Sequence, residues 1–228
     1  MAKKVIKKKK LKILPFLTFI IVIAIIVFSC LLVLNSKVRN IIITGNEILS
    51  DDDIISLAGL TNYPSFYKTL DITMAKKIKQ NKIINKVTIT REFYHIIVIK
   101  VKENQILYKQ ESTGKFTLDN YAKVTIDKET PYLVPRLIND IPSNKVKIFN
   151  KYFKRINLSV REKISEIRYE PNPYDKDRFL LYMDDGNSVY LTITKFERLN
   201  YYNDVLSQLE GKKGILYLDS GNHFQVME

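Results

Sequence analysis

Carboxylates, the oxygen ligands that hard metal ions prefer, gather at two points of the sequence. Asp51-Asp52-Asp53 follow Ser50, and Asp184-Asp185 precede Gly186. The first group stands at the start of a predicted helix, where Ser50 can cap the helix and acidic side chains favour its positive end. The second group lies in a predicted hairpin turn, where Asp and Gly are the usual residues. Both positions predict structural roles, so neither group is assigned as a metal site.

Other catalytic chemistry has few candidate residues. The chain has only two histidines, His95 and His223, which are far apart in sequence, and a single cysteine, Cys30. It contains no HExxH, GxSxG or SxxK motif and no glycine-rich phosphate loop. We therefore assign no catalytic, cofactor-binding or metal-ligating residue, and we predict that the protein is not an enzyme. An exported enzyme whose catalytic residues meet only in three dimensions is the alternative.

One long apolar segment dominates the start of the chain. Residues 13–34 contain no charged side chain, and as a helix they would extend about 33 Å, enough to cross a membrane. Lysine is favoured on the cytoplasmic side of a span, so residues 1–12 are predicted to be a cytoplasmic tail. Everything after Asn35 is then extracellular. The lysines of the tail are Lys3, Lys4, Lys7, Lys8, Lys9, Lys10 and Lys12.

Two other kinds of export segment are alternatives to a retained anchor. A cleaved signal peptide has a shorter apolar stretch of about 7–15 residues and a cleavage site with small residues, unlike Ser36-Lys37-Val38. Val27-Phe28-Ser29-Cys30 loosely resembles a lipoprotein signal, in which Cys30 would carry lipid. Phe28 is bulky for such a site, and the apolar run continues through Leu34. The sequence favours a transmembrane anchor.

The basic composition is concentrated near this anchor. The formal net charge is +13, but residues 1–39 hold nine basic and no acidic residues. The other 28 basic residues are nearly balanced by 24 acidic ones. The predicted extracellular part therefore does not have the strongly basic surface that nucleic acid requires, and no nucleic-acid partner is predicted.

Residues 38–103 predict a first extracellular domain with the order strand, helix, helix, strand, strand. A strand over 38–44 ends at the turn signal Gly45-Asn46, and a helix runs from Ser50 to Gly59. A second helix starts near Asp71. Its predicted inward side chains are Ile72, Ala75 and Ile78. Residues 84–91 and 94–101 predict a pair of strands, and the second is apolar enough to be central in its sheet.

Residues 105–228 predict a larger domain with a mixed sheet and helices. Ser143 is expected to cap a helix, and Thr194 with Glu197 predicts a capping box on the last helix. The first of these helices should bury a stripe made of Val146, Ile148, Phe149, Tyr152 and Phe153. Strands are predicted at 106–110, 115–118, 123–126, 178–183, 187–193, 214–218 and 222–226. The predicted fold class is α+β, with one transmembrane helix ahead of both domains.

This order of segments resembles the FtsQ/DivIB family of bacterial cell-division proteins. Residues 38–46, Val-Arg-Asn-Ile-Ile-Ile-Thr-Gly-Asn, resemble the first strand of a POTRA domain, and 85–91 with 97–103 resemble its closing hairpin. Residues 116–119, 182–187 and 214–218 resemble parts of the family's second, β-rich domain. The chain departs from the family at Glu92-Phe93-Tyr94, where members often have proline.

The resemblance implies a non-catalytic scaffold of the division machinery at the septum. It implies two single-span partners, of the FtsB/DivIC and FtsL types, and a role in assembling and regulating septal peptidoglycan synthesis, with the septal synthases as further partners. By position in the family, the partner would add a strand to a sheet edge formed by Leu218, Ser220, Gly221, Phe224 and Val226. The alternative is a membrane-anchored or lipidated extracellular module that binds cell-wall polymer or a small ligand.

Overall fold

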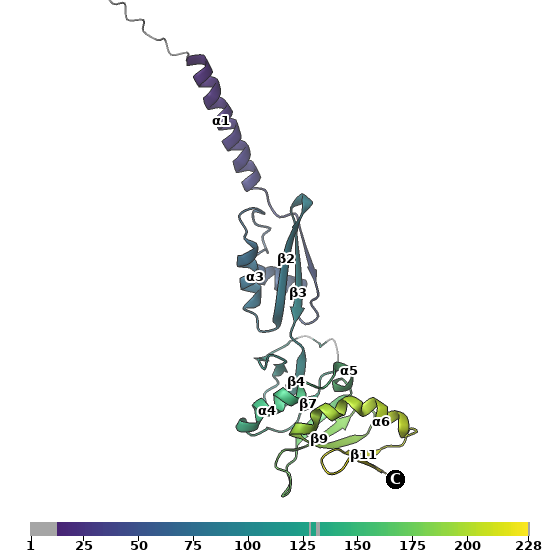
Figure 1. The fold of residues 1–228 in the computed structure, drawn as a ribbon. Helices are drawn as coiled ribbons and strands as arrows, with labels where there is room; N and C mark the ends of the chain where they lie inside the picture. Colours follow the sequence, from purple (N-terminus) through teal and green to yellow (C-terminus); the bar gives the residue numbers. More distant parts are fainter. Residues whose placement is uncertain (1–12, 128, 131–132, 228) are drawn as a thin grey trace, which may run out of the picture.

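The structure is a computed structural model that describes residues 13–127, 129–130 and 133–227. Helix α1 (Ile13–Leu34) extends away from the rest of the molecule (Figure 1). Its segment Pro15–Leu34 is long and apolar enough to cross a membrane, and none of it is buried inside the protein. Cys30 lies within this continuous helix. The predicted cytoplasmic lysines lie outside the described residues.

A three-stranded sheet with two helices follows α1. The strands β1 (Asn40–Thr44), β2 (Ile84–Glu92) and β3 (Ile96–Glu103) are arranged in the order β1-β3-β2, with β3 parallel to β1 and antiparallel to β2. The helices are α2 (Asp51–Ala58) and α3 (Asp71–Lys79). A short 3-10 turn, η1 (Phe93–His95), joins β2 to β3. The predicted order of elements and the central position of the last strand are confirmed.

Local sequence signals explain much of this unit. Ser50 and Asp53 form a reciprocal capping box at the start of α2, and Gly59 ends the helix with a left-handed backbone. Gly45 has a φ of +83°, and a Cβ there would lie 2.3 Å from the carbonyl oxygen of Val101. The predicted roles of Ser50, Gly59 and Gly45 are therefore confirmed.

The predicted inward face of α3 is partly wrong. Ile72 is 84% exposed, whereas Met74 and Ile78 are buried against the sheet. Met74 and Ile78 are four residues apart and therefore lie on one side of the helix. Ile72 precedes Met74 by only two residues, which places it on another side.

The second unit is built on one sheet of nine strands in the order β12-β11-β10-β9-β8-β7-β4-β5-β6. The helices α4, α5 and α6 and the 3-10 helix η2 accompany the sheet. The strands are β4 (Ile106–Gln110), β5 (Phe116–Leu118), β6 (Lys123–Val124), β7 (Arg136–Leu137), β8 (Ile164–Tyr169), β9 (Arg178–Met183), β10 (Ser188–Thr192), β11 (Gly214–Tyr217) and β12 (His223–Val226). The helical segments are α4 (Ser143–Phe153), α5 (Leu158–Arg161), η2 (Ile193–Tyr201) and α6 (Tyr202–Gln208).

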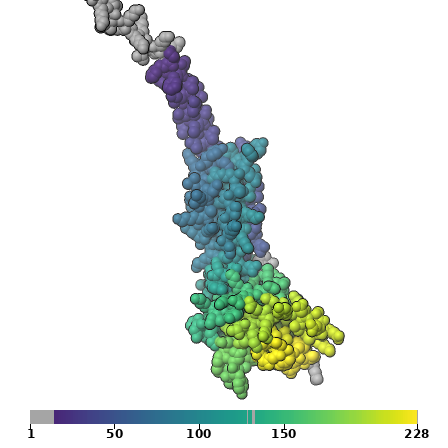
Figure 2. All heavy atoms as spheres, in the orientation of Figure 1, coloured from purple at the N-terminus to yellow at the C-terminus, as the bar shows by residue number. Residues whose placement is uncertain are grey.

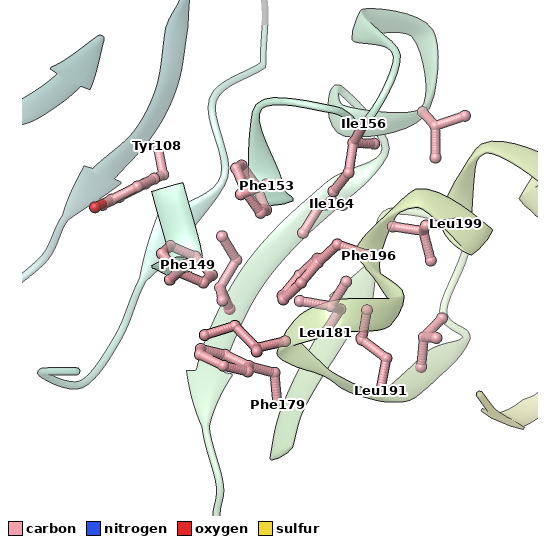
Figure 3. Close-up of a cluster of buried hydrophobic side chains, with 14 of the residues drawn as sticks. Tyr108, Phe149, Phe153, Ile156, Ile164, Phe179, Leu181, Leu191, Phe196 and Leu199 are labelled. Carbon is pink, nitrogen blue, oxygen red and sulfur yellow. The ribbon is translucent and has the colours of Figure 1, made fainter. Parts of the chain in front are cut away.

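An aromatic cluster forms the main core of this unit (Figure 3). Phe149 of α4 stacks on Phe179 of β9 at 4.9 Å between ring centres, and Phe196 of η2 meets both rings edge-on or nearly so. Phe149, Phe153, Phe179 and Phe196 are fully buried. These contacts between distant parts of the chain fix α4 and η2 on the sheet.

Three details of the predicted helices are corrected. Helix α4 already includes Ser143, and Pro142 occupies the capping position without a side-chain hydrogen bond. Ile148 is 47% exposed because Phe149 and Phe153 occupy the inward side. The capping box of Thr194 and Glu197 does not form, because the helical segment already begins at Ile193 as a 3-10 helix without a side-chain cap.

The two units meet in a packed junction. On the first unit's side of the junction, Glu103 at the end of β3 accepts hydrogen bonds from the backbone N–H groups of Glu47, Ile48 and Leu49 of the same unit, at 3.0, 2.6 and 3.0 Å. A separate apolar cluster crosses the junction; its buried members are Ile48, Ile83, Ile106, Phe116 and Leu118. The unit that carries β12 therefore lies at the end of the molecule farthest from α1 (Figures 1 and 2).

Candidate partner-binding edge

Strand β12 is the outermost strand at one end of the nine-stranded sheet, and within the described residues it pairs with β11 alone. The two strands are antiparallel and are connected by residues 218–222. The sheet positions β12 where a further strand can be added without displacing any element of the described chain.

The pairing pattern shows which backbone groups of β12 are free. The N–H of Met227 donates to the carbonyl oxygen of Lys213 at 2.9 Å, which marks this pair as hydrogen-bonded. Hydrogen-bonded and non-hydrogen-bonded pairs alternate along an antiparallel ladder. The non-hydrogen-bonded pairs of this ladder are therefore Leu216–Phe224 and Gly214–Val226. The N–H and C=O groups of Phe224 and Val226 consequently point away from β11, toward the outer side of the sheet.

The helix-covered face beside β12 carries an apolar groove of about 380 Å³. Phe224 packs partly against the core on this face, while Val226 is half exposed. A side chain from an added strand would thus meet an apolar surface here. The groove is lined by Arg198, Leu199, Tyr201, Tyr202, Val205, Leu216, Leu218 and Asn222.

The opposite face carries a row of stacked rings. Tyr190 of β10 stacks on Tyr217 of β11 at 5.5 Å, and Tyr217 stacks on His223 of β12 at 4.7 Å. The guanidinium of Arg178 lies 3.6 Å from the centre of the Tyr190 ring. The row ends at the sheet edge with the exposed imidazole of His223, next to the place where an added strand would lie.

The connection between β11 and β12 is held by charged side chains. Arg178 donates to the Asp219 carboxylate at 2.7 Å, and Lys195 donates to the carbonyl oxygens of Leu218 and Asp219 at 3.0 and 2.9 Å. Burial by itself would raise the pKa of the Asp219 carboxyl, but hydrogen bonds from Arg178 and Ser220 and the charge of Arg178 hold that pKa below its ordinary value. Asp219 therefore fixes the connection as a carboxylate.

Gly214 lets β12 approach β11 closely. A Cβ on Gly214 would lie 2.0 Å from the carbonyl oxygen of Gln225 and 2.9 Å from the ring of Phe224. The Phe224 ring thus packs over Gly214, where no other residue fits. Sequence reasoning did not single out Gly214, although a glycine at the start of a predicted strand is a signal for close backbone approach.

The five predicted site residues lie close together at this edge, but they differ in burial and in the element that carries them. Leu218 is buried beneath the edge, whereas Ser220 and Gly221 are exposed in the connection. Phe224 and Val226 lie on β12 itself. Sequence reasoning missed Arg178 and Lys195, which are 41 and 23 residues from their acceptors and gave no local signal.

The acidic groups considered in the sequence have structural hydrogen bonds. Asp53 accepts from the N–H and hydroxyl of Ser50, and Asp185 accepts from the hydroxyl of Tyr202. In the described part of the chain, no three His, Cys, Asp or Glu side chains gather as a metal site would require. The chemistry available at β12 is recognition of another backbone, supported by an apolar groove.

Comparisons with known proteins agree with both units. Residues 36–104 match the family model of the FtsQ-type POTRA domain, and residues 107–220 match the model of the C-terminal part of the cell division protein FtsQ/DivIB. The second match ends before β12.

Similar curated proteins include DivIB of Bacillus subtilis (strain 168), 32% identical over 195 residues, which are 83% of this chain and 74% of that protein. DivIB of Listeria monocytogenes is 28% identical over 98% of this chain and 85% of its own length. A solved structure, the major extracytoplasmic domain of DivIB from Geobacillus stearothermophilus, aligns with 48% of this chain and 96% of that domain, at 24% identity and a TM-score of 0.39.

Proposed function

The chain belongs to the FtsQ/DivIB family of bacterial cell-division proteins, and from this premise we propose that it is a non-catalytic scaffold of the divisome. Its role is to hold single-span division proteins outside the membrane and so to help assemble and regulate septal peptidoglycan synthesis. Family membership and helix α1 together indicate a membrane-anchored protein with an extracellular domain. We further propose that the tail is cytoplasmic and that the protein is enriched at the septum.

The proposed contact is the addition of a partner strand to β12. The observation that carries it is the outward direction of the backbone groups of Phe224 and Val226 on an uncovered sheet edge. A strand from a partner of the FtsB/DivIC type would bond to these groups, and the FtsL-type partner would be held by the same membrane-distal unit. Alternate side chains of the added strand would face the apolar groove and the ring of His223.

Hydrogen exchange tests this geometry at single residues. In the free protein, the amides of Gln225 and Met227 should exchange slowly because they bond to β11, while those of Phe224 and Val226 should exchange rapidly. The full chain in nanodiscs would be measured with and without the extracellular region of the FtsB/DivIC-type protein of the same bacterium. Selective protection of Phe224 and Val226 on binding supports strand addition; binding that leaves both amides unprotected contradicts it.

A pair of proline substitutions tests the outward backbone groups of β12 separately from those that bond to β11. Val226→Pro removes an outward N–H and leaves the bonds to β11 in place, whereas Gln225→Pro removes a bond to β11. Val226→Pro should weaken partner binding by about tenfold or more while Gln225 stays protected, since one backbone hydrogen bond is lost and the proline ring faces the added strand. Gln225→Pro should detach β12 altogether. Partner affinity unchanged in Val226→Pro would argue against the proposal.

A further inference from the structure

The first extracellular unit carries an aromatic surface at the end nearest α1. Tyr67, Phe93 and Tyr94 form this surface, which we call the proximal aromatic patch; they border one shallow depression beside His95. Phe93 is 90% exposed and Tyr94 77% exposed, although both are large side chains. Large exposed rings grouped at one place indicate a binding surface.

Hydrogen bonds tie the patch to the end of α1. The hydroxyl of Ser65 donates to the carbonyl oxygen of Leu34, the last residue of α1, at 2.5 Å. Lys68 donates to the side chain of Asn35 at 2.6 Å, so both sides of Tyr67 are anchored near this point. Figure 1 shows the β2–β3 hairpin ending at the level of the lower end of α1.

The hairpin tip is fastened to the same linker. The side chain of Ser36 lies 3.0 Å from Nε2 of His95, and the N–H of Arg39 donates to the carbonyl oxygen of His95 at 3.0 Å. The rings of Phe66 and Tyr67 pack edge-on against the His95 ring, at 5.0 and 5.7 Å. The patch therefore cannot move far from the point where the chain leaves α1.

The backbone at the tip holds the exposed rings in an unusual geometry. Tyr94 and His95 both have a φ of 63°, a left-handed conformation that costs a residue other than glycine about 1–2 kcal/mol. Nothing in the described fold covers Phe93 or Tyr94 in return. Backbone strain of this kind is found at functional positions, where the surrounding structure enforces it.

We propose that the proximal aromatic patch rests in the outer surface of the membrane, with phospholipid as its binding partner. When α1 spans the membrane, Leu34 lies at the outer interface, and the patch lies beside Leu34. Tyrosine is enriched at this depth, and phenylalanine inserts among the acyl chains. Lys37 and Arg39 are exposed on the same linker and outnumber the acidic Glu92 of the tip, so anionic headgroups are favoured.

This contact would fix the orientation of the first extracellular unit relative to the membrane. With α1 and the patch both in the membrane, the first unit has two attachment points and cannot swing freely about the linker. The apolar cluster at the junction, in which Ile48 and Ile83 of the first unit pack with Ile106, Phe116 and Leu118 of the second, carries this orientation to the unit that contains β12. The proposal depends on α1 spanning the membrane and is independent of partner binding at β12.

The absence of tryptophan from the sequence gives a direct test. Phe93→Trp introduces a single tryptophan at the patch, and Tyr174→Trp is the matched control, because Tyr174 is 99% exposed in the second unit. Both full-length variants would be placed in nanodiscs of anionic phospholipid, with or without bromine on the acyl chains. Bromine quenches tryptophan fluorescence only on close approach.

We expect the Phe93→Trp emission to be blue-shifted and to be quenched several-fold more strongly by brominated lipid than the Tyr174→Trp emission. Tyr94→Trp should behave as Phe93→Trp does, which guards against a local effect of one substitution. Equal, weak quenching at all three positions would overturn the proposal. A blue shift at Phe93→Trp without bromine quenching would also overturn it, since the ring would then lie against protein and not against lipid.

Discussion

Replacing Gly214 with alanine should release β12 from the sheet. The added Cβ would lie 2.0 Å from the carbonyl oxygen of Gln225, whereas carbon and oxygen normally approach to about 3.3 Å. The strand would have to move by about 1.3 Å, and the Phe224 ring, 2.9 Å away, would have to turn. A shift of this size stretches the 2.9 Å bond between Met227 and Lys213 beyond hydrogen-bonding distance.

The expected free-energy cost follows from the bonds that are lost. Three hydrogen-bonded pairs hold β12, and overpacking at a close contact costs about 1–3 kcal/mol. Because β12 is an edge strand, it can detach while the aromatic core stays folded. A cost of about 3 kcal/mol would shift the equilibrium between the attached and detached strand by about 100-fold.

The assay combines partner affinity with amide exchange at Gln225. Gly214→Ala should lose Gln225 protection and bind the FtsB/DivIC-type partner about 10–100-fold more weakly, with little change in the melting temperature of the core. Gly211→Ala is the control. Gly211 has a φ of +80°, and a Cβ there would meet no atom within 4 Å, so alanine costs about 1 kcal/mol of backbone energy without moving β12. If Gly214→Ala retains both Gln225 protection and partner affinity, the close-approach argument is wrong.

Three further changes have defined outcomes. Gly45→Val should lower the free energy of unfolding by about 3 kcal/mol, because it combines a left-handed backbone with a 2.3 Å contact to the carbonyl oxygen of Val101; an unchanged melting temperature would count against this role. Asp219→Asn should lower the free energy of unfolding by about 1–3 kcal/mol at neutral pH. The lowered pKa of Asp219 means that its stabilising effect is present above the ordinary carboxyl pKa and is lost as pH falls through the folded value, so denaturation curves of the variant and the original protein should converge in acid. Replacing all seven tail lysines with glutamine should scramble membrane orientation, measured by protease access from outside; uniform orientation would contradict the topology.

The sequence determined the features that depend on near neighbours along the chain. The apolar run of 13–34 fixed α1 because helix length follows directly from residue count. Ser50 with Asp53 and Gly59 bounded α2, because caps act within a few residues. The apolar residues 96–99 predicted the central strand of the first sheet, and β3 does lie between β1 and β2. Its buried residues Ile97, Ile99 and Val101 alternate with less buried ones, as in a strand with one face on the core.

Only the tertiary structure decided features that depend on distant partners. Ile72 was predicted to be inward and is exposed, because the position of the sheet selects the side of Met74 and Ile78. The three hydrogen bonds to Glu103 join residues at least 54 positions apart and carry no local signal.

The same limit applies to the candidate site. The sequence places Phe224 and Val226 in a final strand, but the register against β11 decides that their backbone groups face outward. A shift of one residue would turn those groups inward and expose those of Gln225 instead. The register of β12 against β11 is set by packing across the whole sheet, including Phe224 over Gly214. It therefore depends on the tertiary structure and cannot be derived from any short segment of the sequence.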